Sequence, residues 1–381
     1  MKRFKIFTYL SIALLLINTS CSKEPVLDDD GSNTEENGSS GTVASFKVIP
    51  IPTVDVNNLI IPNLAAFYVT NKGAYVQVQD TKKTLWSFYK YHTGTNNWSS
   101  FKPDFPAMSY MPTSFSSEKD NEFSIYWNGD EKYGMYNLNN GAPSFEYEVP
   151  GAPLGPYVFS NVVPSKKGFH RMWGIIGSEI WIETAIESPK TFEKVGEIPL
   201  SEDMTDYPRL FFADPDSETV LWCATQRGLF KVGSVSPNAG GEPGVLNSWD
   251  FSTISSTNII NTIIKVDNSI VVQFGNRVYK LDGTSFKSIG TLNLSSSVVS
   301  NICTNGSTIY ASDGTAYNSS KGTWESFIGN GTNLTGENAS RYDELKRYCS
   351  ITLPIGVING SVNGPVYLLA PNGLIEIHPK L

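Results

Sequence analysis

The feature that most constrains the fold is a strand–turn–strand pattern that recurs at intervals of roughly 35–60 residues. In its first copy, residues 89–101, apolar and polar positions alternate on both sides of a turn built from Gly94, Asn96 and Asn97. Further copies lie at 135–147, 278–286 and 316–324. Four strands per interval are what the blades of a β-propeller need, so the repeat predicts an all-β propeller.

The spacing of the repeat predicts the number of blades. An aromatic residue marks the start of each last strand: Trp98, Phe145, Phe192, Trp249, Phe286 and Trp324. Six full blades are predicted at 64–101, 109–149, 157–198, 207–252, 259–292 and 298–328. A seventh unit, from Leu353 onward, has only three strands, and the segment Phe46–Ile49 carries the pattern of the missing one. We therefore predict a seven-bladed β-propeller of four-stranded blades, with the N-terminal strand completing the last blade. Six or eight blades are the alternatives.

The N-terminal residues have the pattern of an export signal. Lys2, Arg3 and Lys5 precede the apolar run Ile6–Ile17, whose 12 residues are too few to span a bilayer as a helix. Cys21 follows as a candidate lipidation site. We predict a lipoprotein signal peptide at 1–20, a lipidated Cys21 with a disordered acidic linker at 21–43, and the propeller at 44–381. The alternative is an ordinary cleaved signal with an incidental cysteine.

Two resemblances add to this interpretation. The start Cys21-Ser22-Lys23-Glu24, with acidic residues at 28–30, is similar to the export signals of Bacteroidetes surface lipoproteins. That similarity implies a cell-surface exposed protein of the outer membrane, held by acyl chains alone. The repeat itself resembles kelch-type and galactose-oxidase-like propellers, and residues 319–324 resemble the Asp-box of sialidases. No second strand of a blade is followed by the Gly-Gly pair of kelch repeats, so the resemblance concerns the fold.

Composition narrows the range of partners. The net charge is −8, and removal of the three cations of the leader makes it −8 − 3 = −11. An acidic surface repels phosphate backbones, so we expect no nucleic-acid partner. Three cysteines remain after Cys21, an odd number, and a Cys303–Cys349 bridge is possible without being required. We expect a monomer whose core needs no disulfide framework.

No linear pattern of catalytic residues stands out. The three histidines, His92, His170 and His378, lie in different blades without metal-ligand spacing, so neither metal nor cofactor is predicted. The sequence contains no nucleophile elbow, phosphate-binding glycine loop or HExxH motif. A carboxylate pair from distant blades would leave no linear pattern, so a glycoside hydrolase or polysaccharide lyase remains the alternative.

The candidate ligand-binding residues come from equivalent loops. Tyr110, Tyr157 and Tyr207 precede the innermost strands of three consecutive blades, and the insertion 329–348 is expected on the same face. Rings with polar neighbours suit a sugar or a protein partner, although such tyrosines also pack blade against blade. Trp86, Arg227 and Arg277 are further candidates, and each is equally interpretable as a strand or turn residue.

These patterns favour a surface-tethered, non-catalytic binding or scaffold propeller. Its expected ligand is a glycan or an extracellular protein in a nutrient-uptake system. A carbohydrate-active enzyme and a purely structural interaction module are the two alternatives.

Overall fold

The computed structural model describes the chain from residue 43 onward with gaps. The described residues are 43–51, 59–60, 67–70, 73–80, 86–101, 112–115, 122–127, 132–137, 143–148, 161–164, 172–183, 192–199, 208, 210–235, 243–252, 254, 260–294, 301–331, 334–350, 354–358, 361, 364–370 and 373–380. The expected signal peptide, Cys21 and most of the linker lie outside these ranges. For residues 112–164 the description covers the backbone alone.

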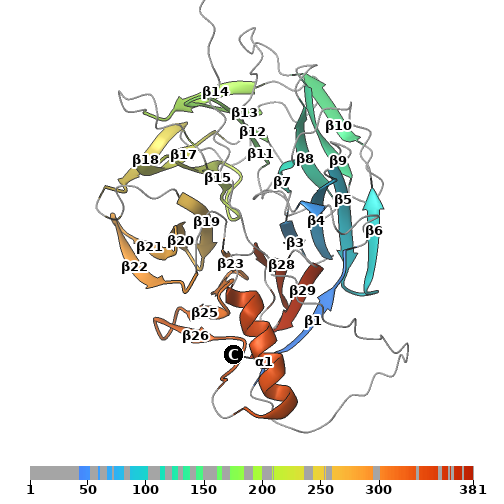
Figure 1. Ribbon diagram of the computed structural model, residues 1–381. Coiled ribbons are helices and arrows are strands. Elements are labelled where there is room, and N and C mark those ends of the chain that lie inside the picture. Colours follow the sequence, from blue (N-terminus) through green and yellow to red (C-terminus); the bar gives the residue numbers. More distant parts are fainter. Residues whose placement is uncertain are drawn as a thin grey trace, which may run out of the picture. The chain divides into compact units, whose positions relative to one another are not determined.

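The described strands form seven antiparallel sheets, numbered here in chain order (Figure 1). Sheet 1 contains β2 (Leu59–Ile60), β3 (Phe67–Thr70), β4 (Gly73–Asp80), β5 (Trp86–His92) and β6 (Asn97–Phe101). Sheet 2 contains β7 (Pro112–Phe115), β8 (Glu122–Trp127), β9 (Lys132–Asn137) and β10 (Pro143–Glu148). Sheet 3 contains β11 (Asn161–Pro164), β12 (Met172–Ile176), β13 (Glu179–Glu183) and β14 (Phe192–Glu197).

The later sheets follow the same order. Sheet 4 contains β15 (Leu210–Ala213), β16 (Val220–Ala224), β17 (Gly228–Gly233) and β18 (Gly244–Asp250). Sheet 5 contains β19 (Ile260–Val266), β20 (Ser269–Phe274), β21 (Arg277–Asp282) and β22 (Ser285–Thr291). Sheet 6 contains β23 (Ile302–Thr304), β24 (Thr308–Ala311), β25 (Thr315–Asn318) and β26 (Thr323–Ser326). Sheet 7 contains β27 (Ile355–Val357), β28 (Val366–Ala370), β29 (Gly373–His378) and β1 (Ser45–Ile49).

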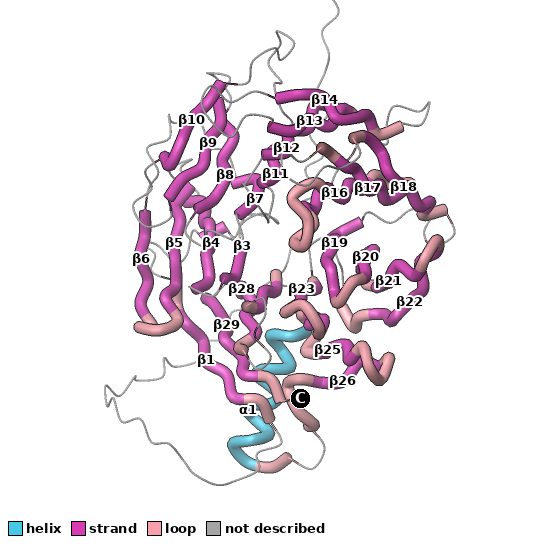
Figure 2. The backbone as a smooth tube through the Cα atoms, turned by 180° about the vertical axis from the view of Figure 1, so that it is seen from behind, coloured by secondary structure: helices cyan, strands magenta, loops and turns pink. Residues whose placement is uncertain are grey.

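The N-terminal strand completes the C-terminal sheet, as the repeat predicts. β1 pairs antiparallel with β29 from Ser45↔His378 to Ile49↔Leu374, and Figure 2 shows the two strands side by side. Lys47 adds an ion pair to Glu376 (3.2 Å) and a hydrogen bond to Asn96 Oδ1 in sheet 1 (3.0 Å). The sheet thereby gains its fourth strand from the other end of the chain.

First strands of successive sheets contact each other. The contacts run from β7 through β11, β15, β19 and β23 to β27, and β27 in turn contacts β3 of sheet 1. At this last junction Gly356 of β27 lies so close that an added Cβ would meet Val69 Cγ2 at 2.5 Å. The arrangement of sheets is propeller-like, with the apolar residues buried mainly between neighbouring sheets.

The turns between the first and second strands form a second set of links. Lys265 of β19 reaches the carboxylates that follow β15. The Asp267 N–H donates to the Gly306 carbonyl (2.7 Å), and Asn305 Nδ2 donates to the Ser361 carbonyl (2.8 Å). Sheets 4 to 7 are therefore joined in sequence by polar contacts at one end of their inner strands.

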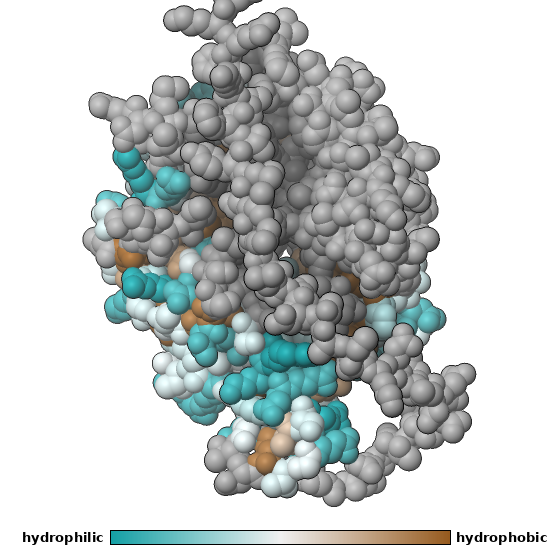
Figure 3. Space-filling view, viewed as in Figure 1, coloured by the Kyte–Doolittle hydropathy of each residue, from teal (hydrophilic) through white to brown (hydrophobic). Residues whose placement is uncertain are grey.

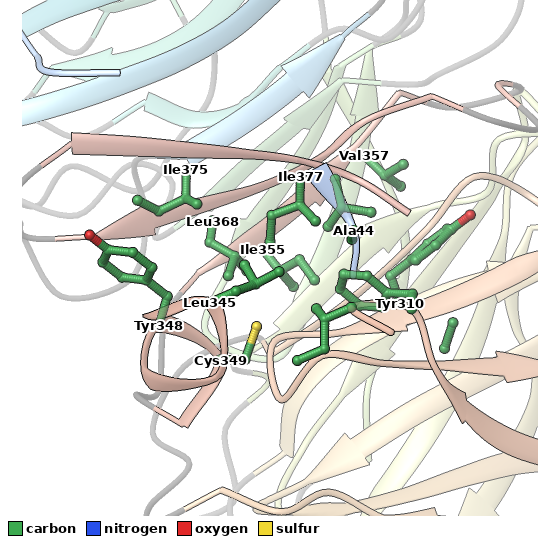
Figure 4. Close-up of a cluster of buried hydrophobic side chains, with 14 of the residues drawn as sticks. Ala44, Tyr310, Leu345, Tyr348, Cys349, Ile355, Val357, Leu368, Ile375 and Ile377 are labelled. Atoms are coloured by element: carbon green, nitrogen blue, oxygen red, sulfur yellow. The ribbon is translucent and has the colours of Figure 1, made fainter. Parts of the chain in front are cut away.

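The insertion after sheet 6 contains a helix that the sequence pattern did not predict. α1 (Gly336–Ser350) buries Leu345, Tyr348 and Cys349 against sheets 6 and 7 (Figure 4). The ring of Tyr348 meets that of Phe46 in β1, with centroids 6.4 Å apart. Only three of its fifteen residues are buried, so the sequence has too few regularly spaced apolar residues to predict a helix. The helix packs against the β1–β29 sheet and reinforces it.

The three cysteines in the described part of the chain are free. Cys223 and Cys349 are buried and Cys303 is half-buried, and no disulfide joins the last two. Burial raises the pKa of all three thiols, that of Cys349 to about 12. A thiol that stays protonated is a poor nucleophile, so these cysteines are packing residues.

The contact at Gly356 gives a test of the junction between sheets 7 and 1. Gly356→Ala forces a methyl group against Val69 and is expected to lower the free energy of unfolding by about 1–3 kcal/mol. Gly94→Ala is the control, because no atom lies within 4 Å of its added Cβ. Chemical denaturation of both variants measures the difference. Equal stabilities would show that β27 and β3 are not in close contact.

The thiols give a second test. Native protein at pH 8 is expected to react slowly with iodoacetamide, whereas unfolding exposes Cys223, Cys303 and Cys349 to rapid alkylation. Mass spectrometry of the alkylated peptides measures both rates. A Cys303–Cys349 cross-linked peptide under non-reducing conditions would contradict the free thiols.

Candidate functional site

A groove of about 490 Å³ lies between sheets 4 and 5. One wall comes from β16, β17 and β18, and the other comes from β19, β20 and β21 with the turns that join them. The lining residues are Asp214, Trp222, Lys231, Leu246, Asn247, Trp249, Lys265, Asn268, Ser269, Ile270, Leu281, Asp282 and Gly283. Such a mixture of aromatic, aliphatic and polar side chains is typical of small-ligand sites.

Strand register builds the sheet 4 wall. Trp222 pairs with Lys231, and Lys231 pairs with Asn247, so the three side chains form one cross-strand row. The Lys231 ammonium lies 5.7 Å from the centroid of the Trp222 ring. Trp249, from the adjacent row, stacks on Trp222 with centroids 5.5 Å apart and an interplanar angle of 29°. Its Nε1 donates to the Gly283 carbonyl in sheet 5 (3.2 Å), which ties the two walls together.

A buried carboxylate holds the inner end of the groove. Asp214 accepts a hydrogen bond from Trp222 Nε1 (3.0 Å) and pairs with the Lys265 ammonium (2.7 Å). Lys265 also contacts Asp216 (2.8 Å). Burial acts to raise the pKa of Asp214, but the hydrogen bonds from Lys265, Trp222 and the Asp216 N–H outweigh it and lower that pKa. For Lys265, burial acts to lower the pKa, and the two aspartates raise it. Both groups stay charged at neutral pH.

Trp249 corrects one expectation about the repeat. The sequence pattern takes it as the aromatic that opens the last strand of its blade. In the structure it is the penultimate residue of β18 and pairs with Leu229. In sheets 1 and 6, the tryptophan is the second residue of the last strand, and Trp98 pairs with Tyr91 as Trp324 pairs with Tyr317. At the equivalent position of sheet 4, Val245 pairs with Val232.

The irregular strand β18 has a close neighbour. At its start Gly244 approaches Gly196 of β14, where an added Cβ would lie 3.0 Å from the Gly244 Cα atom. A bulge between Lys231 and Val232 then shifts the register of β18, and Leu246 falls within the shifted stretch. The departure of this strand from the repeat brings Leu246, Asn247 and Trp249 to the groove.

The rim of the groove is exposed. Leu246 is 39% exposed, and the other exposed large hydrophobic residues of the described part, Val235 and Val245, also belong to sheet 4 or its β17–β18 connection. Asn247 and Asn268 are exposed polar residues on opposite walls. The described surface in Figure 3 is mostly hydrophilic with small apolar areas.

Of the sequence-predicted candidates, Arg227 and Arg277 have described side chains, and neither lines this groove. Tyr110, Tyr157 and Tyr207 lie outside the described residues, so their grouping stays a prediction. Trp86 begins β5, where the description covers its backbone alone. Arg227 and Arg277 are exposed in the hairpins between the second and third strands of sheets 4 and 5, and Arg277 is the first residue of β21.

The sequence contains almost no pattern from which the groove residues could be predicted. Asp214 and Lys265 are 51 residues apart, the first just after β15 and the second near the end of β19, which are the first strands of sheets 4 and 5. Acidic residues at 214 and 216 with a lysine one blade later are the available signal, but many exposed turns share it. Among the described residues, no cluster of histidine, cysteine or carboxylate side chains could hold a metal ion. Within the same ranges, no helix has the length and apolarity to span a membrane.

Comparisons with known proteins show the fold and nothing more specific. No protein-family model matches the chain, and no curated protein sequence matches it. Hydrazine synthase from Kuenenia stuttgartiensis is similar in structure, with a TM-score of 0.53, 9% identity, and coverage of 86% of this chain and 99% of that one. The extracellular domain of a proposed hybrid two component system from Bacteroides thetaiotaomicron has a TM-score of 0.51 and 12% identity. That match covers 89% of this chain, which spans only 43% of the Bacteroides chain.

The ion pair at the inner end of the groove gives a prediction. Asp214→Asn removes the negative charge that pairs with Lys265 and accepts a hydrogen bond from Trp222. We expect it to lower the free energy of unfolding by about 1–3 kcal/mol at pH 7. Because its pKa is lowered in the folded state, the contribution of Asp214 is present above the unfolded pKa near 3.8 and is lost as the pH falls through the folded value.

Urea denaturation of wild type and Asp214→Asn between pH 7 and pH 2.5 measures this difference. The gap in stability between them should narrow with acidification. Asp282→Asn, at the exposed pair with Lys287, is the control and should leave stability nearly unchanged. A gap that stays constant down to pH 2.5 would contradict the role of Asp214.

Proposed function

We propose that this protein is a lipid-anchored, outward-facing component of the outer membrane that binds a glycan without catalysis. In this proposal the seven sheets close into a seven-bladed β-propeller, and Cys21 carries the anchor. The domain acts as a monomer in a nutrient-uptake system, with no cofactor and no nucleic-acid partner. The groove between sheets 4 and 5 is the binding site.

The single observation that carries the proposal is the composition of the groove. The exposed Leu246 and the half-buried Leu281 offer apolar surface over two stacked, largely buried indoles, while Asn247, Asn268 and Ser269 offer hydrogen-bonding groups. A sugar also combines apolar and polar groups, because its C–H faces are apolar and its hydroxyl groups are polar. The carboxylates in the lining support a non-catalytic role, since Asp214 and Asp282 are both ion-paired. A general acid needs a raised pKa, whereas the pKa values of both groups are lowered.

The position outside the cytoplasm rests on two supports. The first is the leader, with its short apolar run before Cys21. The second is the likeness of fold to an extracellular domain from Bacteroides thetaiotaomicron. Extracellular placement and a preformed groove together favour ligand capture at the cell surface.

Glycan screening tests the proposal. Purified full-length protein in detergent is applied to a polysaccharide panel, and each binder is titrated against Leu246→Ala/Asn268→Ala, a variant of two exposed lining residues. We expect at least a ten-fold loss of affinity, because each change removes contact area or a hydrogen bond at the rim. Val245→Ala is the matched control, because it is an exposed apolar residue of the same strand outside the groove lining.

The other outcomes separate the alternatives. Binding that survives in the double variant but is lost when Tyr110, Tyr157 and Tyr207 are all changed to Ala moves the site to the predicted tyrosine cluster. Release of shorter products from an oligosaccharide identifies an enzyme. Failure on every glycan, together with recovery of a specific protein partner, leaves the structural interaction module.

A further inference from the structure

The two carboxylates that line the groove already have partners. Asp214 Oδ1 accepts from Lys265 Nζ and from the Asp216 N–H, and its Oδ2 accepts from Trp222 Nε1. Asp282 pairs with Lys287. The carboxylates are therefore turned toward partners of the protein itself, and a ligand gains little by offering them donors.

Two hydrogen-bond donors of the sheet 4 wall, Lys231 and Asn247, have no carboxylate partner among the described residues. Lys231 is half-buried, and within the described residues its ammonium contacts the Trp222 ring and forms no ion pair with a carboxylate. Asn247 Oδ1 accepts from the Ser248 N–H (2.8 Å), which directs the Nδ2 donors of this exposed side chain outward. In the described part of the chain, no acceptor meets that amide nitrogen.

Register places these donors together. Lys231 and Asn247 are direct cross-strand partners on β17 and β18, next to Trp222 in the same row. Directly opposed residues of a sheet have Cβ atoms about 4.5–5.5 Å apart, so both side chains rise from the same part of the sheet 4 wall. Leu246, which is 39% exposed, supplies apolar surface for a sugar ring on the same strand as Asn247.

We propose that the groove selects acidic saccharides, with a carboxylate of the ligand accepting hydrogen bonds from Lys231 Nζ and Asn247 Nδ2. This inference rests on the proposed glycan-binding function and names the class of glycan. A charged acceptor on an ammonium and an amide makes hydrogen bonds about twice as strong as neutral ones. Selectivity for the acidic sugar follows, because its neutral analogue leaves the Lys231 charge without a counter-charge.

Calorimetric titration with an oligogalacturonide and its methyl ester tests the inference. The ester keeps the sugar ring and removes the charge, so the acid is expected to bind about ten-fold more tightly at low salt. Lys231→Met keeps an unbranched apolar chain beside Trp222 and removes the ammonium. This variant should bind the acid and the ester equally, whereas Lys231→Arg should keep the preference. The advantage of the acid should shrink as salt rises.

The outcomes separate this inference from the function on which it rests. If wild type binds the ester as tightly as the acid, and Leu246→Ala/Asn268→Ala weakens both, glycan binding stands and the acidic selectivity is overturned. A preference for the acid that persists in Lys231→Met also overturns it. Absence of binding to either oligosaccharide and to the polysaccharide panel overturns both proposals. Tight binding of free acetate would show that the donors recognise any carboxylate, and it would overturn selection of a saccharide.

Discussion

The antiparallel pairing of β1 with β29 is the contact on which the rest of the structure depends. It joins the first described strand to the last, and it gives sheet 7 the fourth strand that its own stretch of chain lacks. The same sheet supports α1 through Phe46 and Tyr348 and meets sheet 1 through Gly356. Closing so long a loop costs conformational entropy, which the ladder, the Lys47–Glu376 pair and the helix together offset.

The groove arises where one sheet departs from the common pattern. In sheets 1 and 6 a tryptophan near the start of the outer strand packs against a tyrosine of the neighbouring strand. In sheet 4 the outer strand starts with a glycine that approaches β14 and presents its tryptophan near its end, whereas its bulge is a feature that it shares with sheets 2, 3 and 5. These features bring Leu246, Asn247 and Trp249 of one strand to the groove.

The polar side chains of the groove form two groups, one paired within the protein and one without an ion-pair partner among the described residues. Asp214 and Lys265 neutralise each other and hold Trp222 in place, so they set the shape of the wall. Lys231 and Asn247 have no such partners among the described residues, and they remain for a ligand. This division gives the site its chemistry, because a site with satisfied acceptors and free donors favours anionic groups.

Sequence alone determined the four-strand repeat, its order and the pairing of Phe46–Ile49 with the last sheet, because side-chain alternation and turn residues are local signals and a repeat multiplies them. It did not predict β2, which makes sheet 1 five-stranded. It did not determine α1, whose buried residues are too few to form an apolar stripe, or the place of Trp249, since a bulge shifts register without a clear sequence mark. Only the tertiary structure decided the groove. Asp214, Lys231 and Lys265 come from different strands and neighbouring sheets, and their proximity depends on how those sheets pack, which no local pattern records.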